Sequence, residues 1–188
     1  MIQMIAYHDR DGHLCRPYPQ YVPNWENLTP YQRGNPFYIK APDQQQLLPG
    51  VKQLLSTYKY NFVVSNQRWH SGEKTIEDVV MEARWLMYQL PLNGFCFCYD
   101  SGETAWLLED ADSSPILLSS LYPHLIGTFR KPQAGMVKAL QLHYNIPPGT
   151  PQILIGDRLT DQACAIAASI DFQWSDIARG YPDPATRN

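Results

Sequence analysis

Asp9 and Asp11 stand two residues apart, directly after an apolar run that is typical of a strand, and Gly12 follows them. Side chains at positions i and i+2 of a strand project to the same side, and glycine allows the chain to turn sharply afterwards. Two carboxylates held this close repel each other unless a cation or a shared proton relieves them. The pair suits phosphoryl chemistry, in which one aspartate attacks phosphorus, the other moves a proton and Mg²⁺ neutralises the cluster. An acidic turn is the alternative interpretation of this segment taken alone.

Three more polar clusters lie at the ends of predicted elements. Residues 65–67 offer a hydroxyl and two amides, which are neutral donors for phosphate oxygens. Residues 130–131 place an arginine and a lysine just before a predicted helix, whose first N–H groups favour an anion. Asp157 and Asp161 bring two further acids to the end of another strand. Each cluster alone could be an ordinary turn, cap or solvated pair, but together they supply the parts of one magnesium-phosphate site.

The elements that would position these clusters alternate along the chain. Short apolar runs predict strands, and apolar residues at helical spacing predict helices between them. Strands alternating with helices indicate an α/β fold with a parallel sheet, which binds ligands beyond the carboxyl ends of its strands. A last short strand and turn are expected over residues 171–177. The strands are predicted at residues 3–8, 61–65, 94–99 and 152–156, and the helices at about 49–58, 75–89, 132–144 and 160–169.

Composition limits the class of protein. The chain has 188 residues, of which 44% are hydrophobic and 18% charged, as expected for one globular domain. The sequence shows no membrane span and no signal peptide, and a net charge of −3 provides no general attraction to nucleic acid. Zinc-type spacing is missing from the four cysteines, so buried, reduced thiols in a cytoplasmic protein are the favoured interpretation. The oligomeric state cannot be predicted from these features.

The order of the clusters resembles the haloacid dehalogenase (HAD) superfamily of phosphohydrolases. The likeness is strongest to the subgroup of heptose bisphosphate phosphatase and the histidinol-phosphatase domain. It implies a Rossmann-like fold, a parallel sheet flanked by helices, no large cap domain, and a single domain over residues 1–188. The matching motifs are His8-Asp9-Arg10-Asp11-Gly12, Val63-Val64-Ser65-Asn66-Gln67, Arg130-Lys131-Pro132 with Gly135-Met136, and Ile155-Gly156-Asp157-Arg158-Leu159-Thr160-Asp161.

The resemblance implies a role for each matching residue. Asp9 would be the nucleophile that forms an aspartyl-phosphate, and Asp11 would be the general acid and then the general base. Ser65 and Lys131 would bind the transferring phosphoryl group. The remaining roles implied are substrate binding by Asn66, Arg130 and His13, binding of Mg²⁺ by Asp9, Asp157 and the main-chain carbonyl of Asp11, and support of the site by Gly12 and Asp161.

The chain also departs from these relatives. Their zinc loop carries a Cys-x-His and a Cys-x-Cys pair, whereas Gly127 and Phe129 stand at the second pair here, so no zinc is expected. His13 replaces the usual threonine, and either a substrate contact or simple tolerance of the change is possible. Residues 14–48 form a flap-type insert rich in proline and aromatic side chains, which is expected to be extended or turned rather than helical. It could bind a planar substrate, or its aromatics could pack on the domain.

We therefore expect a Mg²⁺-dependent phosphomonoester hydrolase acting on a small phosphorylated metabolite, such as a sugar phosphate or a compound similar to histidinol phosphate. A polynucleotide 3′-phosphatase is the alternative enzyme, although the net charge does not favour nucleic acid as a partner. A HAD-like binding protein without turnover is the alternative outside catalysis. Membrane association is not expected.

Overall fold

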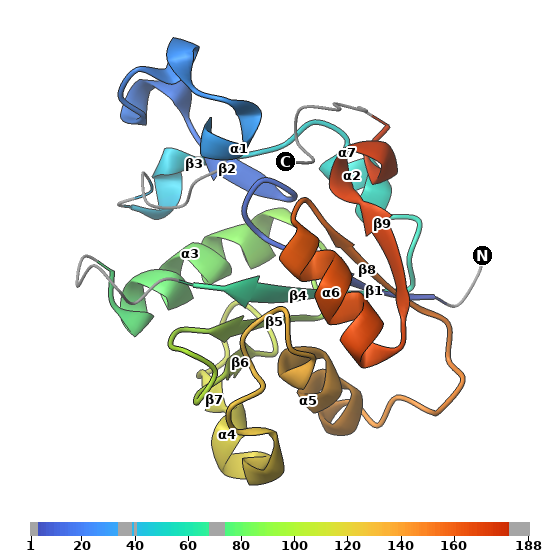
Figure 1. Cartoon of the computed structure of the whole chain (residues 1–188). Coiled ribbons are helices and arrows are strands. Elements are labelled where there is room, and N and C mark those ends of the chain that lie inside the picture. Colours follow the sequence, from blue (N-terminus) through green and yellow to red (C-terminus); the bar gives the residue numbers. More distant parts are fainter. Residues whose placement is uncertain (1–3, 34–38, 40, 68–73, 181–188) are drawn as a thin grey trace.

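A seven-stranded sheet in the order β7-β6-β5-β4-β1-β8-β9 carries the fold (Figure 1). The computed structural model describes residues 4–33, 39, 41–67 and 74–180. Its elements, in chain order, are β1 (Ile5–His8), β2 (Cys15–Pro17), η1 (Pro19–Tyr21), η2 (Trp25–Asn27), α1 (Pro30–Arg33), η4 (Pro42–Gln44), β3 (Gln45–Leu47), α2 (Val51–Leu55), β4 (Tyr60–Asn66), α3 (Ile76–Gln89), β5 (Gly94–Cys98), β6 (Trp106–Leu108), β7 (Ile116–Leu117), α4 (Leu118–Leu121), η5 (Pro123–Leu125), α5 (Gly135–His143), β8 (Gln152–Gly156), α6 (Leu159–Ala168), β9 (Asp171–Trp174) and α7 (Ser175–Ala178).

The predicted parallel sheet is confirmed. Strand β1 pairs in parallel with β4 on one side and with β8 on the other, and β5 and β9 extend the sheet in parallel. The antiparallel strands β6 and β7 complete one edge of the sheet. The sequence analysis does not predict them and treats their residues as part of the loop after β5. The four strands that periodicity predicted correspond to β1, β4, β5 and β8, with ends that agree for β8 and differ by at most two residues for the others.

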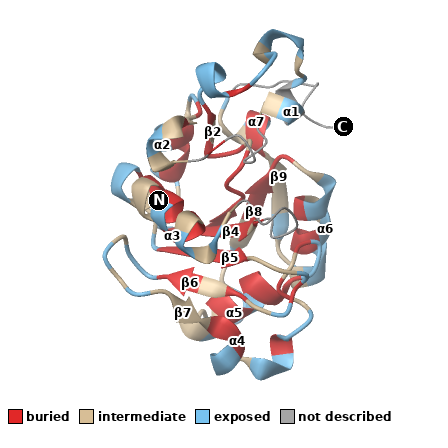
Figure 2. Ribbon diagram, turned by 90° about the vertical axis from the view of Figure 1, so that its left-hand side faces the viewer, coloured by how far each residue is buried: buried red, intermediate tan, exposed pale blue. Residues whose placement is uncertain are grey.

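Two hydrophobic cores lie on opposite faces of the sheet because successive strand side chains point to opposite sides. Phe62 and Val64 of β4 belong to the core beneath α5 and α6, whereas Val63, between them, belongs to the core beneath α2 and α3. Strand β5 alternates in the same way. The central strands are accordingly buried, while the outer faces of the helices are exposed (Figure 2).

Several predicted helix ends are wrong by a few residues. Helix α3 begins as predicted, because the side chain of Thr75 accepts a hydrogen bond from the Asp78 N–H at 3.2 Å. Helix α2 ends at Leu55, three residues early, and α5 begins only at Gly135. Pro132 therefore lies in the turn before α5 rather than in its first turn.

The insert predicted at residues 14–48 contains a short hairpin of β2 and β3, and Figure 1 shows it beyond the sheet. The expectation that its prolines exclude helix is wrong for the single turns η1, η2, η4 and α1. Proline is compatible with the first turn of a helix, where its missing N–H has no partner in any case. Insert residues 34–38 and 40, and the C-terminal residues 181–188, lie outside the described residues.

Candidate active site

The register of the sheet brings the predicted acids together. His8 lies beside Val63 of β4 and Ile155 of β8, so residues that follow these positions emerge at the same edge. The backbone N–H of Asp9 donates to the Ile155 carbonyl at 2.9 Å, which continues the pairing by one residue. Asp9, Ser65 and Asp157 consequently lie at neighbouring strand ends, as expected for a parallel sheet that binds its ligand there.

Lys131 lies between two carboxylates at this edge. Its Nζ is 2.7 Å from Oδ1 of Asp9 and 2.6 Å from Oδ1 of Asp161. Burial opposes the charge of the lysine, but the two adjacent carboxylates outweigh it and raise the Lys131 pKa above its ordinary value. The lysine is therefore a fixed, permanently charged partner for the predicted nucleophile.

Asn66 and Arg130 hold the segment around Lys131 in place. The Asn66 amide donates to the Lys131 carbonyl at 2.9 Å, and its Oδ1 accepts from the Lys131 N–H at 2.9 Å. The Arg130 guanidinium donates to the carbonyls of Gln67, at 3.1 Å, and Asp100, at 2.8 Å. Both side chains join separate loops at the strand ends. The substrate contacts predicted for them remain predictions.

Gly12 allows the loop that carries Asp9 and Asp11 to approach Asp157. It has a φ of +78°, and a Cβ added there would lie 2.3 Å from Oδ2 of Asp157. Only glycine combines that backbone conformation with so close a contact. Oδ1 of Asp157 is buried and accepts no hydrogen bond within the described residues. Burial, reinforced by the charge of Asp9, raises the Asp157 pKa well above its ordinary value.

These features fit a divalent cation. Asp9, Asp157 and Asp161 each offer a carboxylate oxygen, and these atoms lie within 4.8 Å of one another. Three buried carboxylates are hard oxygen donors, which is the chemistry that Mg²⁺ prefers, and Oδ1 of Asp157 accepts no hydrogen bond within the described residues, although Nε of Arg158 lies 3.9 Å from it. Asp161 already binds Lys131, and its Oδ2 accepts from the Arg158 N–H at 3.0 Å, while the supporting role predicted for it remains a prediction.

Asp11 and Ser65 lie on the other side of the loop and share one partner. The side-chain amide of Gln67 donates to Oδ2 of Asp11 at 3.1 Å and to Oγ of Ser65 at 2.8 Å. Arg10 is fully buried and reaches Oδ1 of Asp11 at 3.5 Å. The sequence analysis predicts no role for Arg10. Its position between two predicted active-site acids could have indicated such a role.

His13 lies in the interior beside His8. Its Nε2 is 2.9 Å from Nδ1 of His8, whose Nε2 is 3.0 Å from Oδ1 of Asn61. Because Asn61 Oδ1 can only accept, His8 carries its proton on Nε2 and His13 donates to its Nδ1. His13 thus has a partner within the fold, and the substrate contact predicted for it remains a prediction.

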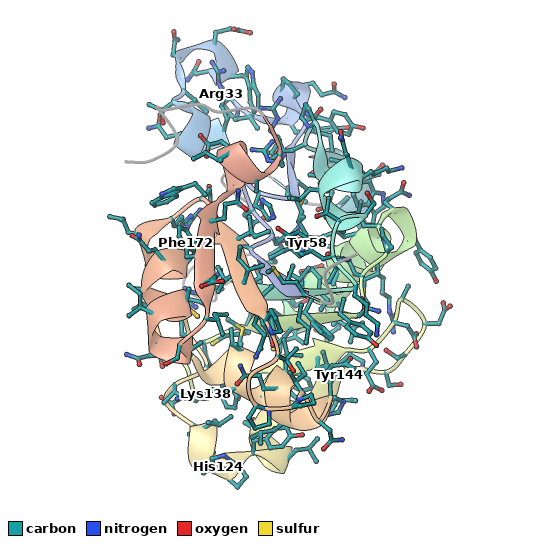
Figure 3. All side chains as sticks on the ribbon, turned by 90° about the vertical axis from the view of Figure 1, so that its right-hand side faces the viewer. Arg33, Tyr58, His124, Lys138, Tyr144 and Phe172 are labelled. Carbon is teal, nitrogen blue, oxygen red and sulfur yellow. The ribbon has the colours of Figure 1, made fainter. Side chains whose placement is uncertain are left out.

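The loop that follows β5 is hydrogen-bonded to the segment that precedes Lys131. Oδ1 of Asp100 accepts from the N–H groups of Gly102, Glu103 and Thr104, and Gly127 donates to the Gly102 carbonyl at 3.0 Å. Direct hydrogen bonds from Gly127 and Phe129, the two positions that replace the second cysteine pair, thus reach the loop after β5, and the expectation of no zinc remains a prediction. His124 lies at the end of the molecule opposite Arg33 of the insert (Figure 3).

Two further sequence expectations concern the whole chain. Each of the four cysteines lies in the described part, and all are buried and unpaired, as predicted. Of the helices that the structure describes, none has the length and apolar character needed to span a membrane.

Comparisons with known proteins support the fold. No family model and no curated protein matches the chain. A solved structure, described as a candidate phosphoglycolate phosphatase from Lactobacillus plantarum, has a TM-score of 0.52 and 16% sequence identity, and the match covers 97% of this chain and 90% of that chain. The predicted α/β fold, a mostly parallel sheet flanked by helices, is confirmed and is shared with that structure over nearly the whole length of both chains.

Proposed function

We propose that this protein is a HAD-superfamily phosphatase, a Mg²⁺-dependent phosphomonoester hydrolase that acts through an aspartyl-phosphate. The observation that carries the proposal is the placement of the Lys131 amino group between Asp9 and Asp161, in a buried carboxylate cluster that also includes Asp157. Phosphoryl transfer depends on positioning and on neutralising charge. A buried lysine and a carboxylate cluster supply both at one point.

In the proposed reaction, a carboxylate oxygen of Asp9 attacks phosphorus while the bond from phosphorus to the leaving alcohol breaks. Asp11 gives its proton to the departing oxygen. Water then attacks the phosphorus of the aspartyl-phosphate and loses a proton to Asp11, which frees the Asp9 carboxylate and inorganic phosphate. The hydrogen bond from Gln67 orients Asp11 for both transfers.

The charge on the transferring group would be met by Lys131 and by the hydroxyl of Ser65. Mg²⁺ would be held by the carboxylates of Asp9 and Asp157 and by the main-chain carbonyl of Asp11. When bound, it would supply further neutralisation of the phosphoryl oxygens. Asp161 and Gly12 would support this arrangement, the first by holding Lys131 and the second by admitting Asp157.

A small phosphorylated metabolite is the substrate class that we favour, and a cytoplasmic location accords with four unpaired thiols. In the insert, the Trp25 ring is contacted by Arg16 at 5.3 Å and by Arg33 at 5.1 Å. Because two arginines of the insert already cover this ring, packing of the aromatic side chains is favoured over stacking on a nucleic-acid base. A polynucleotide 3′-phosphatase is therefore the less favoured enzyme.

Phosphate release tests the proposal. The panel should contain sugar phosphates, histidinol phosphate, phosphoglycolate, nucleotides and a 3′-phosphorylated oligonucleotide, each with Mg²⁺ and with chelator. We expect Mg²⁺-dependent release from one class of small ester, and none from the Asp9→Asn variant. Mg²⁺ binding with no release from any ester would instead favour a binding protein without turnover. Release that Asp9→Asn leaves unchanged would refute the mechanism.

A further inference from the structure

A fully buried arginine lies beside the active-site loop and is held by a residue of a distant helix. The Nη2 of Arg10 is 2.6 Å from Oε2 of Glu82, which belongs to α3 and is only 2% exposed. The same carboxylate oxygen is 2.7 Å from Nζ of Lys74. Glu82 stands on the buried face of α3, next to Ala83 and one turn from Val79. A carboxylate placed there has to be paired, because an isolated buried charge is very costly.

The two terminal nitrogens of the guanidinium face four residues. Nη2 also donates to Oε1 of Gln45 at 2.9 Å, and Gln45 in turn donates to the Glu82 main-chain carbonyl at 3.2 Å. Nη1 donates to Oε1 of Gln67 at 3.2 Å and lies 3.5 Å from Oδ1 of Asp11. Since the guanidinium is planar and rigid, fixing Nη2 on α3 and the insert also fixes the direction of Nη1.

The bond from Arg10 to Gln67 decides which way the Gln67 amide faces. Arg10 can only donate, so the oxygen of that amide must face it. The amide nitrogen then faces Asp11 and Ser65, at 3.1 Å and 2.8 Å. A reversed amide would set an oxygen against the Asp11 carboxylate and lose the contact with Arg10. The orientation of Asp11 is thus linked through two side chains to the charge on Glu82.

We infer that Glu82 and Arg10 are positioning residues that orient Asp11 and Ser65 through Gln67 for proton transfer and phosphoryl binding. The inference rests on the proposed function. Glu82 acts through Arg10, and Arg10 itself also lies 3.5 Å from Oδ1 of Asp11. Their contribution is to hold one orientation of the Gln67 amide and of the Asp11 carboxylate before substrate arrives.

The Glu82→Gln variant tests the inference, with Glu77→Gln as its matched control, because Glu77 is an exposed residue of the same helix. Kinetics should be measured on an alkyl phosphate and on an aryl phosphate. The alkoxide that leaves from the alkyl ester depends on a proton from Asp11. If the aryl ester is a nitrophenyl phosphate, its nitrophenolate leaves with little help from a proton donor. We expect kcat for the alkyl ester to fall roughly ten- to hundredfold in Glu82→Gln, as for lost outer-shell partners of active-site groups. In Glu82→Gln, kcat for the aryl ester should fall less, and KM for both esters should stay unchanged. Glu77→Gln should have the same kinetic constants as the parent.

A merely structural role for Glu82 predicts a different result. It would lower the active fraction and reduce the rates for both esters equally. Such an equal loss, or no loss at all, would overturn the inference. If Glu82→Gln does not fold, the double variant Arg10→Met with Glu82→Met removes both charges together, which buried pairs tolerate better than the loss of one partner. It should show the same selective loss of kcat, and full alkyl activity in it would also overturn the inference.

A second measurement needs no substrate. The side-chain amide protons of Gln67 can be followed by NMR for exchange with solvent in the parent, Glu82→Gln and Glu77→Gln. We expect faster exchange in Glu82→Gln alone. Unchanged protection would overturn the inference whether or not the protein is a phosphatase. Faster exchange in Glu82→Gln, together with a parent protein that hydrolyses no ester, would refute the proposed function and leave the positioning of Asp11 standing.

Discussion

Replacing Gly12 with alanine should separate backbone strain from damage to the candidate metal site. A Cβ at Gly12 would lie 2.3 Å from Oδ2 of Asp157, whereas ordinary van der Waals contact begins at 3.4 Å. The difference, 3.4 − 2.3 = 1.1 Å, is the distance by which the two atoms must separate to reach ordinary contact. Asp157 therefore has to move, or the loop that carries Asp9 and Asp11 has to move with the new methyl group.

The expected magnitudes follow from that displacement. A left-handed alanine costs about 1–2 kcal/mol of stability. A shift of about 1 Å in an active-site group costs on the order of a hundredfold in rate. We therefore expect the phosphatase activity of Gly12→Ala to be lower by on the order of a hundredfold. Its Mg²⁺ affinity should be roughly ten- to a hundredfold weaker, as when the arrangement of metal ligands is disturbed.

Gly149→Ala is the matched control. Gly149 has a φ of +81°, close to the +78° of Gly12, but a Cβ there would meet nothing within 4 Å. The two variants therefore carry similar backbone strain, and only Gly12→Ala disturbs Asp157. Calorimetric Mg²⁺ titration, urea unfolding and phosphate release should be measured for both. A Gly12→Ala protein that loses stability as Gly149→Ala does, yet keeps parental Mg²⁺ affinity and activity, would refute the reasoning.

Three further predictions concern the charges of the site. Asp9→Asn should abolish phosphate release with little change in the circular dichroism spectrum, whereas Asp157→Asn should chiefly weaken Mg²⁺ binding in a calorimetric titration. Lys131→Met should destabilise the fold by about 3–5 kcal/mol in urea unfolding without Mg²⁺, because it leaves two buried carboxylates unpaired; an unchanged midpoint would contradict this. Burial lowers the pKa of His8 to about 4. In the unfolded chain the histidine pKa is about 6.5, so the unfolded chain binds the proton at a higher pH than the folded one does. His8 should therefore lower the free energy of unfolding by about 2–3 kcal/mol as the pH falls from about 6.5 to about 4. Unfolding at pH 7 and pH 4.5 should show a larger loss in the parent than in His8→Gln, which keeps only the loss due to the buried His13, whose pKa burial also lowers.

Much of the fold could be predicted from local sequence. Apolar runs such as residues 61–65 mark buried strands, and the Thr75 cap with the apolar stripe behind it marks α3, because these signals lie within a few neighbouring residues. The hairpin of β2 and β3 and the edge strands β6 and β7 were missed. They are too short for periodicity to separate them from loops, and what stabilises them is pairing with a partner distant in the chain.

The candidate site, like the fold, could be predicted from the sequence only in part. The sequence by itself determined the acid pair, the serine, the lysine and the later acids, and their order along alternating elements indicated one shared edge, because parallel strands end together. Only the tertiary structure decided which oxygen meets which partner. It set Lys131 between Asp9 and Asp161, and it gave the Asn66 and Arg130 side chains contacts between loops.

The structure likewise brought Glu82 of α3 to Arg10 and through Gln67 to Asp11. In the sequence Glu82 was visible only as a carboxylate on an apolar helix face, with no indication of its partner. The physical reason is that pairing of buried charges depends on how helices pack against the sheet, and packing joins residues that local patterns cannot relate.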